Sequence, residues 1–160
     1  MSDSKIWKLL EQVPDPEIPV LSVIDLGVVR KIEKQQDKIT ITITPTYSGC
    51  PAMNQFEDDI IAHLKSNGYS NVIIKTTYTP AWTTDWLTDN AKKKLEEYGI
   101  APPLEKTTDK RFILNQSPMV RCPQCKSTNT KMISQFGSTA CKSLYQCNEC
   151  KEPFDYFKCL

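Results

Sequence analysis

The sequence predicts an α+β protein: a two-layer α-β-β-α-β-α domain followed by a small zinc ribbon. Helical and strand periodicities alternate in that order over the first part of the chain. Two Cys-x-x-C pairs and few large apolar residues mark the last part. Residues 1–105 hold 11 Lys and Arg against 15 Asp and Glu, whereas residues 106–160 hold 9 against 4. We therefore expect an α+β domain over residues 1–105, a linker over 106–120 and a zinc ribbon over 121–160.

The beginning of the chain is expected to form a helix, a fixed loop and a hairpin. Apolar residues recur at helical spacing as far as Pro14, which ends the helix. Three prolines within residues 14–19 then exclude both a helix and a central strand. Residues 28–33 and 38–44 have strand character, and the second segment alternates isoleucine with threonine. The polar segment 34–37 joins them as a hairpin.

A helix, a strand and a last helix complete the first domain. Pro51 suits the first position of a helix, so Cys50 is expected at or beside the helix N-cap. The helical pattern ends at Asn67-Gly68, and residues 71–78 read as the third strand. The last helix is expected to run from about Asp85 to Tyr98.

The ribbon is predicted from the spacing of its cysteines. Two C-x-x-C pairs are separated by 21 residues, and they comprise Cys122, Cys125, Cys147 and Cys150. Such pairs can complete a tetrahedron of thiolates around structural zinc. An iron–sulfur cluster or a redox dithiol is the alternative use of the same residues. Cys141 remains a competing ligand, and Cys141 and Cys159 could otherwise be cluster ligands, packing residues or redox thiols.

Cys50 and two carboxylates form the other candidate site. A thiol at the start of a helix faces unpaired N–H groups, which favour the thiolate, so Cys50 could bind a soft metal or act as a nucleophile. The alternative is a small buried residue that packs the start of the helix. Asp15 and Glu17, in the proline-rich loop, are either metal or water ligands or solvated turn residues.

Composition and charge narrow the classes of function. No apolar run approaches the roughly 20 residues that span a bilayer, and the N-terminus lacks the apolar block of a secretory signal, so we expect a cytoplasmic protein without membrane contact. An odd number of cysteines, 7, argues against a disulfide framework. Four zinc-bound thiolates would offset part of the positive charge of residues 106–160, and no dense arginine run is present, so nucleic-acid binding is not expected.

Three motifs carry a resemblance to a known family. Residues 15–19 (DPEIP), 23–27 (VIDLG) and 48–51 (SGCP) resemble the MIP18 family, also called the domain of unknown function 59, whose members assemble iron–sulfur clusters. The resemblance implies an iron–sulfur-assembly-like fold. It also implies that Cys50 binds or transfers a cluster, with Asp15 and Glu17 on a neighbouring loop. Since one cysteine cannot hold a cluster, such a cluster would be transient, with other ligands from a second copy, a client protein or a small thiol.

The remainder of the chain resembles a family of phenylacetate-degradation proteins grouped with the phenylacetyl-CoA epoxidase. This resemblance rests on residues 81–86 (AWTTDW), 98–103 (YGIAPP), 136–142 (FGSTACK) and 152–159 (EPFDYFKC). It implies a non-catalytic accessory factor that matures the metal centres of a diiron oxygenase and an iron–sulfur reductase. A direct structural or electron-transfer subunit is the alternative, and a zinc-ribbon nucleic-acid adaptor is a third. A diiron centre needs several Glu and His ligands, whereas the chain has one histidine. A shared cluster would favour a homodimer.

Overall fold

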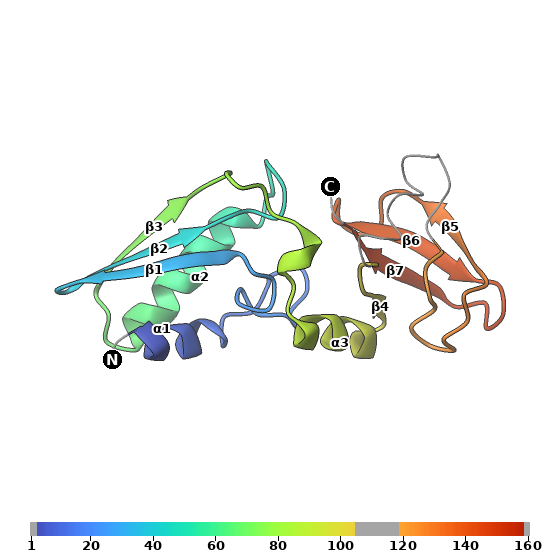
Figure 1. Ribbon diagram of the computed structural model, residues 1–160, viewed down its shortest axis with the longest axis horizontal. Helices are drawn as coiled ribbons and strands as arrows, with labels where there is room; N and C mark the ends of the chain where they lie inside the picture. The colour runs from blue at the N-terminus through green and yellow to red at the C-terminus, as the bar shows by residue number, and fades with distance from the viewer. Residues whose placement is uncertain (1–2, 105–118, 159–160) are drawn as a thin grey trace. The chain divides into compact units, whose positions relative to one another are not determined.

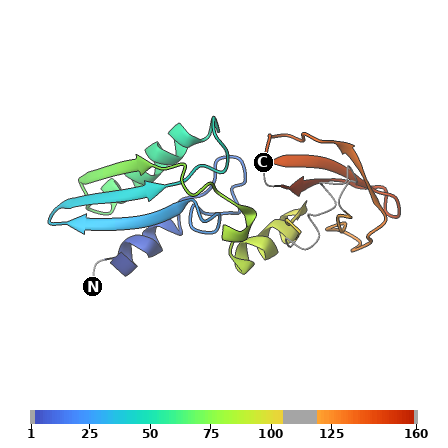
Figure 2. The same cartoon turned by 45° about the horizontal axis from the view of Figure 1, so that its top comes forward.

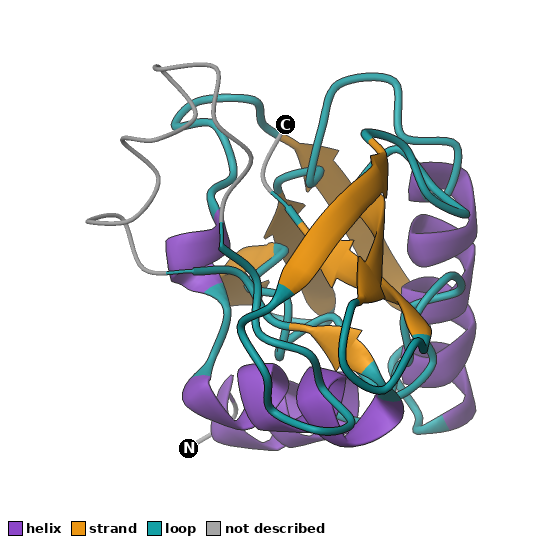
Figure 3. Ribbon diagram, turned by 90° about the vertical axis from the view of Figure 1, so that its right-hand side faces the viewer, coloured by secondary structure: helices purple, strands orange, loops and turns teal. Residues whose placement is uncertain are grey.

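The computed structural model describes residues 3–104 and 119–158 of the chain. These residues belong to two compact units, and the chain passes from one to the other between Ala91 and Lys92. Figure 1 labels the helices and strands, and Figure 3 colours them by class. Helices and two separate sheets confirm the predicted α+β class. Within the described ranges, no helix is both long enough and apolar enough to cross a bilayer.

The first unit has a layer of helices and a three-stranded sheet. The sheet order is β1-β2-β3, formed by β1 (Val29–Gln35), β2 (Lys38–Ile43) and β3 (Asn71–Thr76). Helix α1 (Asp3–Leu10) contacts β1 and α2, and helix α2 (Met53–Ser66) contacts β3. In Figure 2 the three strands lie side by side with α2 behind them. The predicted order of these elements is confirmed.

Strand β2 is central, and its side chains alternate as the sequence predicts. It pairs antiparallel with β1 through the predicted hairpin and parallel with β3, with α2 as the crossover. Ile39, Ile41 and Ile43 are buried, while the intervening Thr40 and Thr42 are half-buried on the opposite face. The isoleucine face therefore supplies the core between the sheet and the helices.

The loop that precedes β1 is fixed by two tryptophans from residues 82–86. The indole Nε1 of Trp82 donates a hydrogen bond to the carbonyl of Leu26 at 2.8 Å. Gly27 has a φ of +67°, and a Cβ atom there would lie 2.5 Å from the carbonyl oxygen of Trp86. A glycine is required at position 27 for two reasons: the left-handed backbone and the close approach of Trp86.

Replacing Gly27 with alanine is expected to destabilise the first unit by about 2–5 kcal/mol. The left-handed backbone contributes about 1–2 kcal/mol of strain, and overpacking against Trp86 contributes about 1–3 kcal/mol. Gly68→Ala is the matched control, because Gly68 has a φ of +90° but no atom within 4 Å of an added Cβ. Urea unfolding measures both variants. Equal losses for the two would show that the contact with Trp86 adds nothing.

The last predicted helix begins later than expected. A 3-10 turn, η1 (Thr84–Trp86), comes first, and the α-helix α3 spans Asp89–Tyr98. Leu87 between them is extended, with a ψ of 133°. The hydroxyl of Thr88 accepts a hydrogen bond from the N–H of Ala91 at 3.0 Å and so caps α3. The prediction of a helix from Asp85 onward was wrong at its start, because η1 and the Thr88 cap interrupt it.

The second unit contains a four-stranded sheet with the order β4-β7-β6-β5. Its strands are β4 (Ile100–Ala101), β5 (Thr130–Ser134), β6 (Lys142–Cys147) and β7 (Pro153–Phe157). The buried core is small, and it consists of Ala101, Val120, Cys122, Tyr145, Cys147, Phe154 and Tyr156. Two cysteines of the C-x-x-C pairs thus belong to the core itself.

Strand β4 and Val120 lie on the first-domain and linker sides of the predicted boundaries, but both belong to the ribbon sheet or its core. Sequence analysis did not predict β4, which pairs parallel with β7 and so joins residues 100–101 to the ribbon sheet. Most of the predicted linker, residues 106–118, lies outside the described residues. Val120, predicted as the end of the linker, is buried in the ribbon core. The boundaries at 105 and 121 stay predictions.

Candidate functional site

The four cysteines of the two C-x-x-C pairs converge in the second unit. The sulfur atoms of Cys122, Cys125, Cys147 and Cys150 all lie within 4.8 Å of one another. The Sγ of Cys122 is 3.7 Å from that of Cys150, and the Sγ of Cys125 is 3.5 Å from that of Cys147. Sulfurs bound to one zinc ion at about 2.3 Å lie about 3.8 Å apart. The donor set and its dimensions therefore fit a tetrahedral zinc site.

Backbone hydrogen bonds shape the first knuckle, residues 122–127, around this site. The N–H of Cys122 donates to the carbonyl of Ser127 at 2.9 Å, and the N–H of Lys126 donates to the carbonyl of Cys122 at 3.0 Å. Lys126 takes a left-handed backbone with a φ of 64°. This tight turn brings Cys122 and Cys125 to one side of the chain.

The second knuckle, residues 147–152, repeats the same design. The N–H of Cys147 donates to the carbonyl of Glu152 at 3.0 Å, which matches the bond from Cys122 to Ser127. Lys151 follows the second cysteine of its pair and also has a left-handed backbone, with a φ of 67°. The two knuckles therefore share the same backbone hydrogen bond and the same left-handed lysine, although they come from different segments of the chain.

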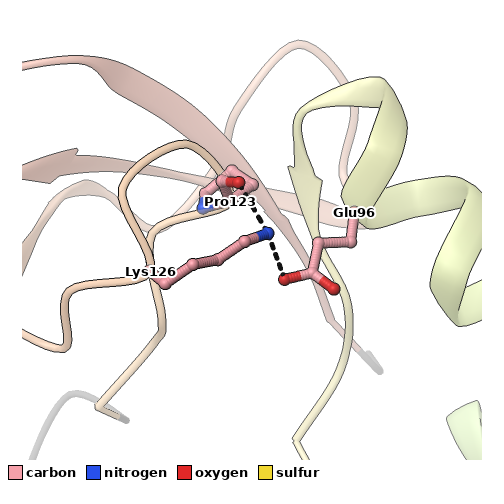
Figure 4. A network of polar contacts seen from close by, with 3 residues as sticks. All are labelled: Glu96, Pro123 and Lys126. Atoms are coloured by element: carbon pink, nitrogen blue, oxygen red, sulfur yellow. Dashed lines mark hydrogen bonds and ion pairs between the residues drawn. The ribbon is translucent and has the colours of Figure 1, made fainter.

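Each knuckle contains one lysine, Lys126 or Lys151, whose ammonium group donates a hydrogen bond to a backbone carbonyl of the same knuckle. The Nζ of Lys126 donates to the carbonyl of Pro123 at 2.9 Å and pairs with Glu96 of α3 at 2.6 Å (Figure 4). The Nζ of Lys151 donates to the carbonyl of Asn148. Four thiolates around one Zn²⁺ carry a net double negative charge, so two nearby ammonium groups favour the metal-bound form.

The thiols of the four-cysteine group affect one another's pKa. Burial opposes ionisation of Cys147, but hydrogen bonds from the backbone N–H groups of Cys150 and Glu149 and from the neighbouring thiols lower the pKa of Cys147, whereas the neighbouring sulfurs raise the pKa of Cys150. Since zinc binds the thiolate, a lowered thiol pKa reduces the competition from protons.

Two further cysteines of the C-terminal part of the chain, Cys141 and Cys159, stand outside the four-cysteine group. Cys141 is not a member of the four-cysteine group, although its residue is also buried in the second unit. The sequence leaves Cys141 open as a competing zinc ligand. The geometry favours the two C-x-x-C pairs over Cys141. Cys159 lies outside the described residues.

Cys50 lies in the turn that leads from β2 into α2. Its N–H donates to the carbonyl of Tyr47 at 3.4 Å, and its carbonyl accepts from the N–H of Met53 at 3.2 Å. The N-cap of α2 is Ala52, so Cys50 lies two residues before the cap and close to the expected position. The predicted place of Pro51 in the first position of the helix was wrong, because Pro51 comes directly before the cap.

The Cys50 residue is buried, although its two neighbours in the chain are exposed. It is 8% exposed, while Gly49 and Pro51 on either side of it are exposed. Gly49 has a φ of +79°, and a Cβ atom added there would meet no other atom within 4 Å, so the backbone beside Cys50 faces open space. The chain on either side of Cys50 is therefore accessible, while the cysteine itself is buried.

The carboxylate of Asp15 organises the proline-rich loop. Asp15 is 7% exposed, and its Oδ1 accepts hydrogen bonds from the N–H groups of Glu17 and Ile18. Asp15 is therefore not a solvated turn residue, and Glu17 is half-buried. The sequence analysis missed the similar role of Asp25, whose buried carboxylate accepts from the N–H and hydroxyl of Ser22.

Comparisons with known proteins agree with this geometry for both units. Residues 3–73 match the family model of an iron–sulfur cluster assembly protein, and residues 106–158 match the PaaD zinc β ribbon domain. The chain is 27% identical to a domain of unknown function 59 of known structure from Bacillus anthracis, with a TM-score of 0.55 over 58% of this chain and 90% of that one. A conserved hypothetical protein from Thermotoga maritima is 26% identical, with a TM-score of 0.50 over 59% of this chain and 94% of that one.

Two curated relatives resemble the chain in sequence. One, from Porphyromonas gingivalis (strain ATCC BAA-308 / W83), is an Fe–S protein maturation auxiliary factor and is 33% identical over 96 residues, 59% of this chain and 90% of that protein. The other, from Escherichia coli (strain K12), is 49% identical over 156 residues, 98% of this chain and 92% of that protein. Its name makes it a component of the 1,2-phenylacetyl-CoA epoxidase, and that assignment is itself provisional.

Fold, site and matches together define the class: an iron–sulfur assembly domain joined to a zinc β ribbon. More narrowly, the chain belongs to the PaaD family, which includes the Escherichia coli relative.

Proposed function

We propose that this protein is a non-catalytic accessory factor that matures the iron–sulfur or iron centres of a phenylacetyl-CoA epoxidase in the cytoplasm. The observation that carries the proposal is Cys50, a thiol under a surface loop of a domain that matches iron–sulfur cluster assembly proteins. The identity of 49%, over nearly the whole chain, to a relative named as an epoxidase component points to that client. The clients would be the diiron oxygenase and the iron–sulfur reductase of the system.

Cys50 would receive the cluster as cargo and pass it on. Cys50 is the only cysteine among residues 1–105, and a cluster needs several thiolate ligands. The remaining ligands would come from a second copy of the chain, from the client or from a small thiol, which makes the bound state transient. The exposed residues on both sides of Cys50 leave room for a partner to approach, and the loop would open for this exchange.

The zinc site would have a structural role in this scheme. Four protein sulfurs close the coordination sphere, whereas catalytic zinc sites keep one position open for water or substrate. The ribbon would thus be a stable module for docking onto the client. Its knuckle lysines donate to oxygens of the ribbon itself, which leaves them less available to nucleic-acid phosphates.

The maturation role predicts metal-poor epoxidase in the absence of this protein. The oxygenase and reductase subunits would be produced together with the wild-type chain, with its Cys50→Ala variant, or with neither. Iron content and the visible spectrum of the reductase are expected to be at least about fivefold lower without the wild-type chain, because a single missing thiol interrupts delivery. Normal metal content in all three preparations would contradict the proposed maturation role.

A further inference from the structure

An arginine and a tryptophan form an exposed stack on the first unit. The guanidinium carbon of Arg30 in β1 lies 3.6 Å from the centre of the Trp86 ring in η1, a distance at which a cation and an aromatic face attract one another. Arg30 is exposed and Trp86 is half-buried, whereas Trp82, the other tryptophan of segment 81–86, is buried. The stack therefore presents a planar, positively charged group at the surface of this unit.

A β-bulge in β1 sets the direction of Arg30. The register with β2 shifts between Val29 and Lys31, so Arg30 is an extra residue without a partner in β2. The burial agrees, because Val29 and Ile32, three residues apart, are both buried, whereas an uninterrupted strand would place them on opposite faces. Bulges re-aim side chains and are common beside functional sites. The bulge thus removes Arg30 from the regular alternation of β1.

The tryptophan beneath Arg30 is held in place by its backbone. A Cβ atom at Gly27 would lie 2.5 Å from the carbonyl oxygen of Trp86 and 2.8 Å from its Cβ, so the two segments are in close contact. The N–H of Trp86 also donates to the carbonyl of Thr83 at 3.1 Å. Because the indole is fixed, Arg30 stacked on it loses less freedom when it binds a further group.

The guanidinium group of Arg30 keeps most of its hydrogen-bonding capacity. Arginine carries five N–H donors, and Nη1 of Arg30 lies 3.5 Å from the carbonyl oxygen of Gly27, at the outer limit for a hydrogen bond. Among the residues that the structure describes, no carboxylate lies within 4.0 Å of this guanidinium. A planar cation with donors to spare matches the two oxygens of a carboxylate.

Arg30 lies at the end of the sheet where the Cys50 loop, residues 44–52, begins. Thr44 donates its N–H to the carbonyl of Val28 at 2.9 Å, only two residues before Arg30. The loop then leads from β2 into α2 (Figure 1). A typical protein interface covers about 800 Å² on each partner. A client that receives cargo from Cys50 would therefore cover more of this end of the sheet than the loop alone.

We propose, on the premise of the maturation role, that the Arg30–Trp86 stack binds a carboxylate side chain of the client protein that receives cargo from Cys50. Both oxygens of an Asp or Glu of the client accept hydrogen bonds from the guanidinium group, while the indole holds that group flat. Arg30 does not touch the cargo. It is a positioning residue, which fixes the client over the Cys50 loop.

The charges around the stack favour a protein carboxylate over a nucleic-acid phosphate. The same two elements also carry acidic residues, Glu33 in β1 and Asp85 in η1. Glu33 pairs with Lys31 at 2.8 Å, which neutralises one of the neighbouring cations. A polyanion needs several unpaired cations along its backbone, whereas a single carboxylate needs one guanidinium group.

The test measures binding of the zinc-loaded full chain to the purified oxygenase and reductase subunits of the epoxidase by titration calorimetry at low salt, where charge pairs are least screened. Arg30→Gln is expected to raise the Kd for the client at least about tenfold. Arg30→Lys should restore little of the affinity, because an ammonium group cannot bind a carboxylate through two parallel hydrogen bonds. Lys34→Gln is the matched control: it removes another exposed cation of β1 and should change the Kd less than about twofold.

The metal content of the epoxidase separates this inference from the maturation role. If the wild-type chain and Arg30→Gln bind equally well and raise the metal content equally, the docking role of Arg30 is overturned and the maturation role stands. If the wild-type chain binds neither subunit or leaves the metal content unchanged, both are overturned. Binding of a short DNA duplex that is stronger than binding of either subunit and depends on Arg30 also overturns the docking role.

A second readout separates docking from an effect on the Cys50 loop itself. The isolated Arg30→Gln chain, treated with ferrous iron, sulfide and a small thiol, should gain the same visible absorbance as the wild type, because no client takes part in that reaction. Its urea midpoint should also stay near the wild-type value, since Arg30 is exposed. A loss of absorbance in the isolated chain would show that Arg30 shapes the loop, and this would overturn its assignment to client docking.

Discussion

Replacing Cys147 with serine is expected to unfold the C-terminal ribbon and leave the first unit folded. Wild-type protein should bind about one zinc ion per chain, and Cys147→Ser should bind almost none. The physical reason is the small core of the ribbon, in which two of the seven core residues are themselves cysteines of the metal site. Metal binding contributes on the order of 10 kcal/mol of apparent free energy to such domains, far more than these side chains can replace.

The measurement combines zinc analysis with amide spectra. Amide signals from residues 119–158 should lose their dispersion in the variant, while signals from residues 3–91 should keep it, because the first unit has its own core. Cys141→Ser is the matched control: it removes a buried ribbon thiol that lies outside the metal group, so zinc content should stay near one per chain. A folded wild-type ribbon without zinc would contradict this account of its stability.

Periodicity and spacing predicted most of this fold, because those signals come from residues that are close in sequence. The isoleucines of β2 alternate with threonines, and that pattern alone predicts a strand with one buried face. The four candidate metal ligands follow from the spacing of two short pairs, since each knuckle is a local turn.

The features that sequence analysis missed depend on distant contacts. β4 is only two residues long and exists because β7 pairs with it, so no local pattern could reveal it. The break before α3 depends on Thr88, whose hydroxyl caps the helix and also lies 3.4 Å from the carboxylate of Asp25 in an earlier loop. Such long-range contacts override a helical pattern that would otherwise extend further.

Buried charges were the hardest feature to predict. Sequence analysis considered the positive charge of residues 106–160 only as a sum, yet two of its lysines, Lys142 and Lys158, are buried. The available signal was their place at the ends of strands, where a side chain can fold under the neighbouring loop. That signal is shared by many exposed lysines, which is why the structure was needed to separate them.

Replacing Cys50 with alanine is expected to abolish cluster formation on the first unit. After anaerobic treatment of the zinc-loaded chain with ferrous iron, sulfide and a small thiol, the wild type should gain visible absorbance, and Cys50→Ala should lose at least about nine tenths of it. Cys50 is the only sulfur ligand within residues 1–105 apart from methionine, and iron–sulfur clusters require thiolate ligands. Cys141→Ser should keep the wild-type absorbance, because that thiol belongs to the ribbon.

The oligomeric state during reconstitution identifies where the other ligands come from. If a second copy supplies them, the absorbance should travel with a dimer and should increase with protein concentration, because each copy contributes one Cys50. If the small thiol supplies them, the absorbance should stay with the monomer and should fall when that thiol is removed. Equal absorbance in the wild type and Cys50→Ala would place the cluster elsewhere, and the loop between β2 and α2 would then have no part in carrying it.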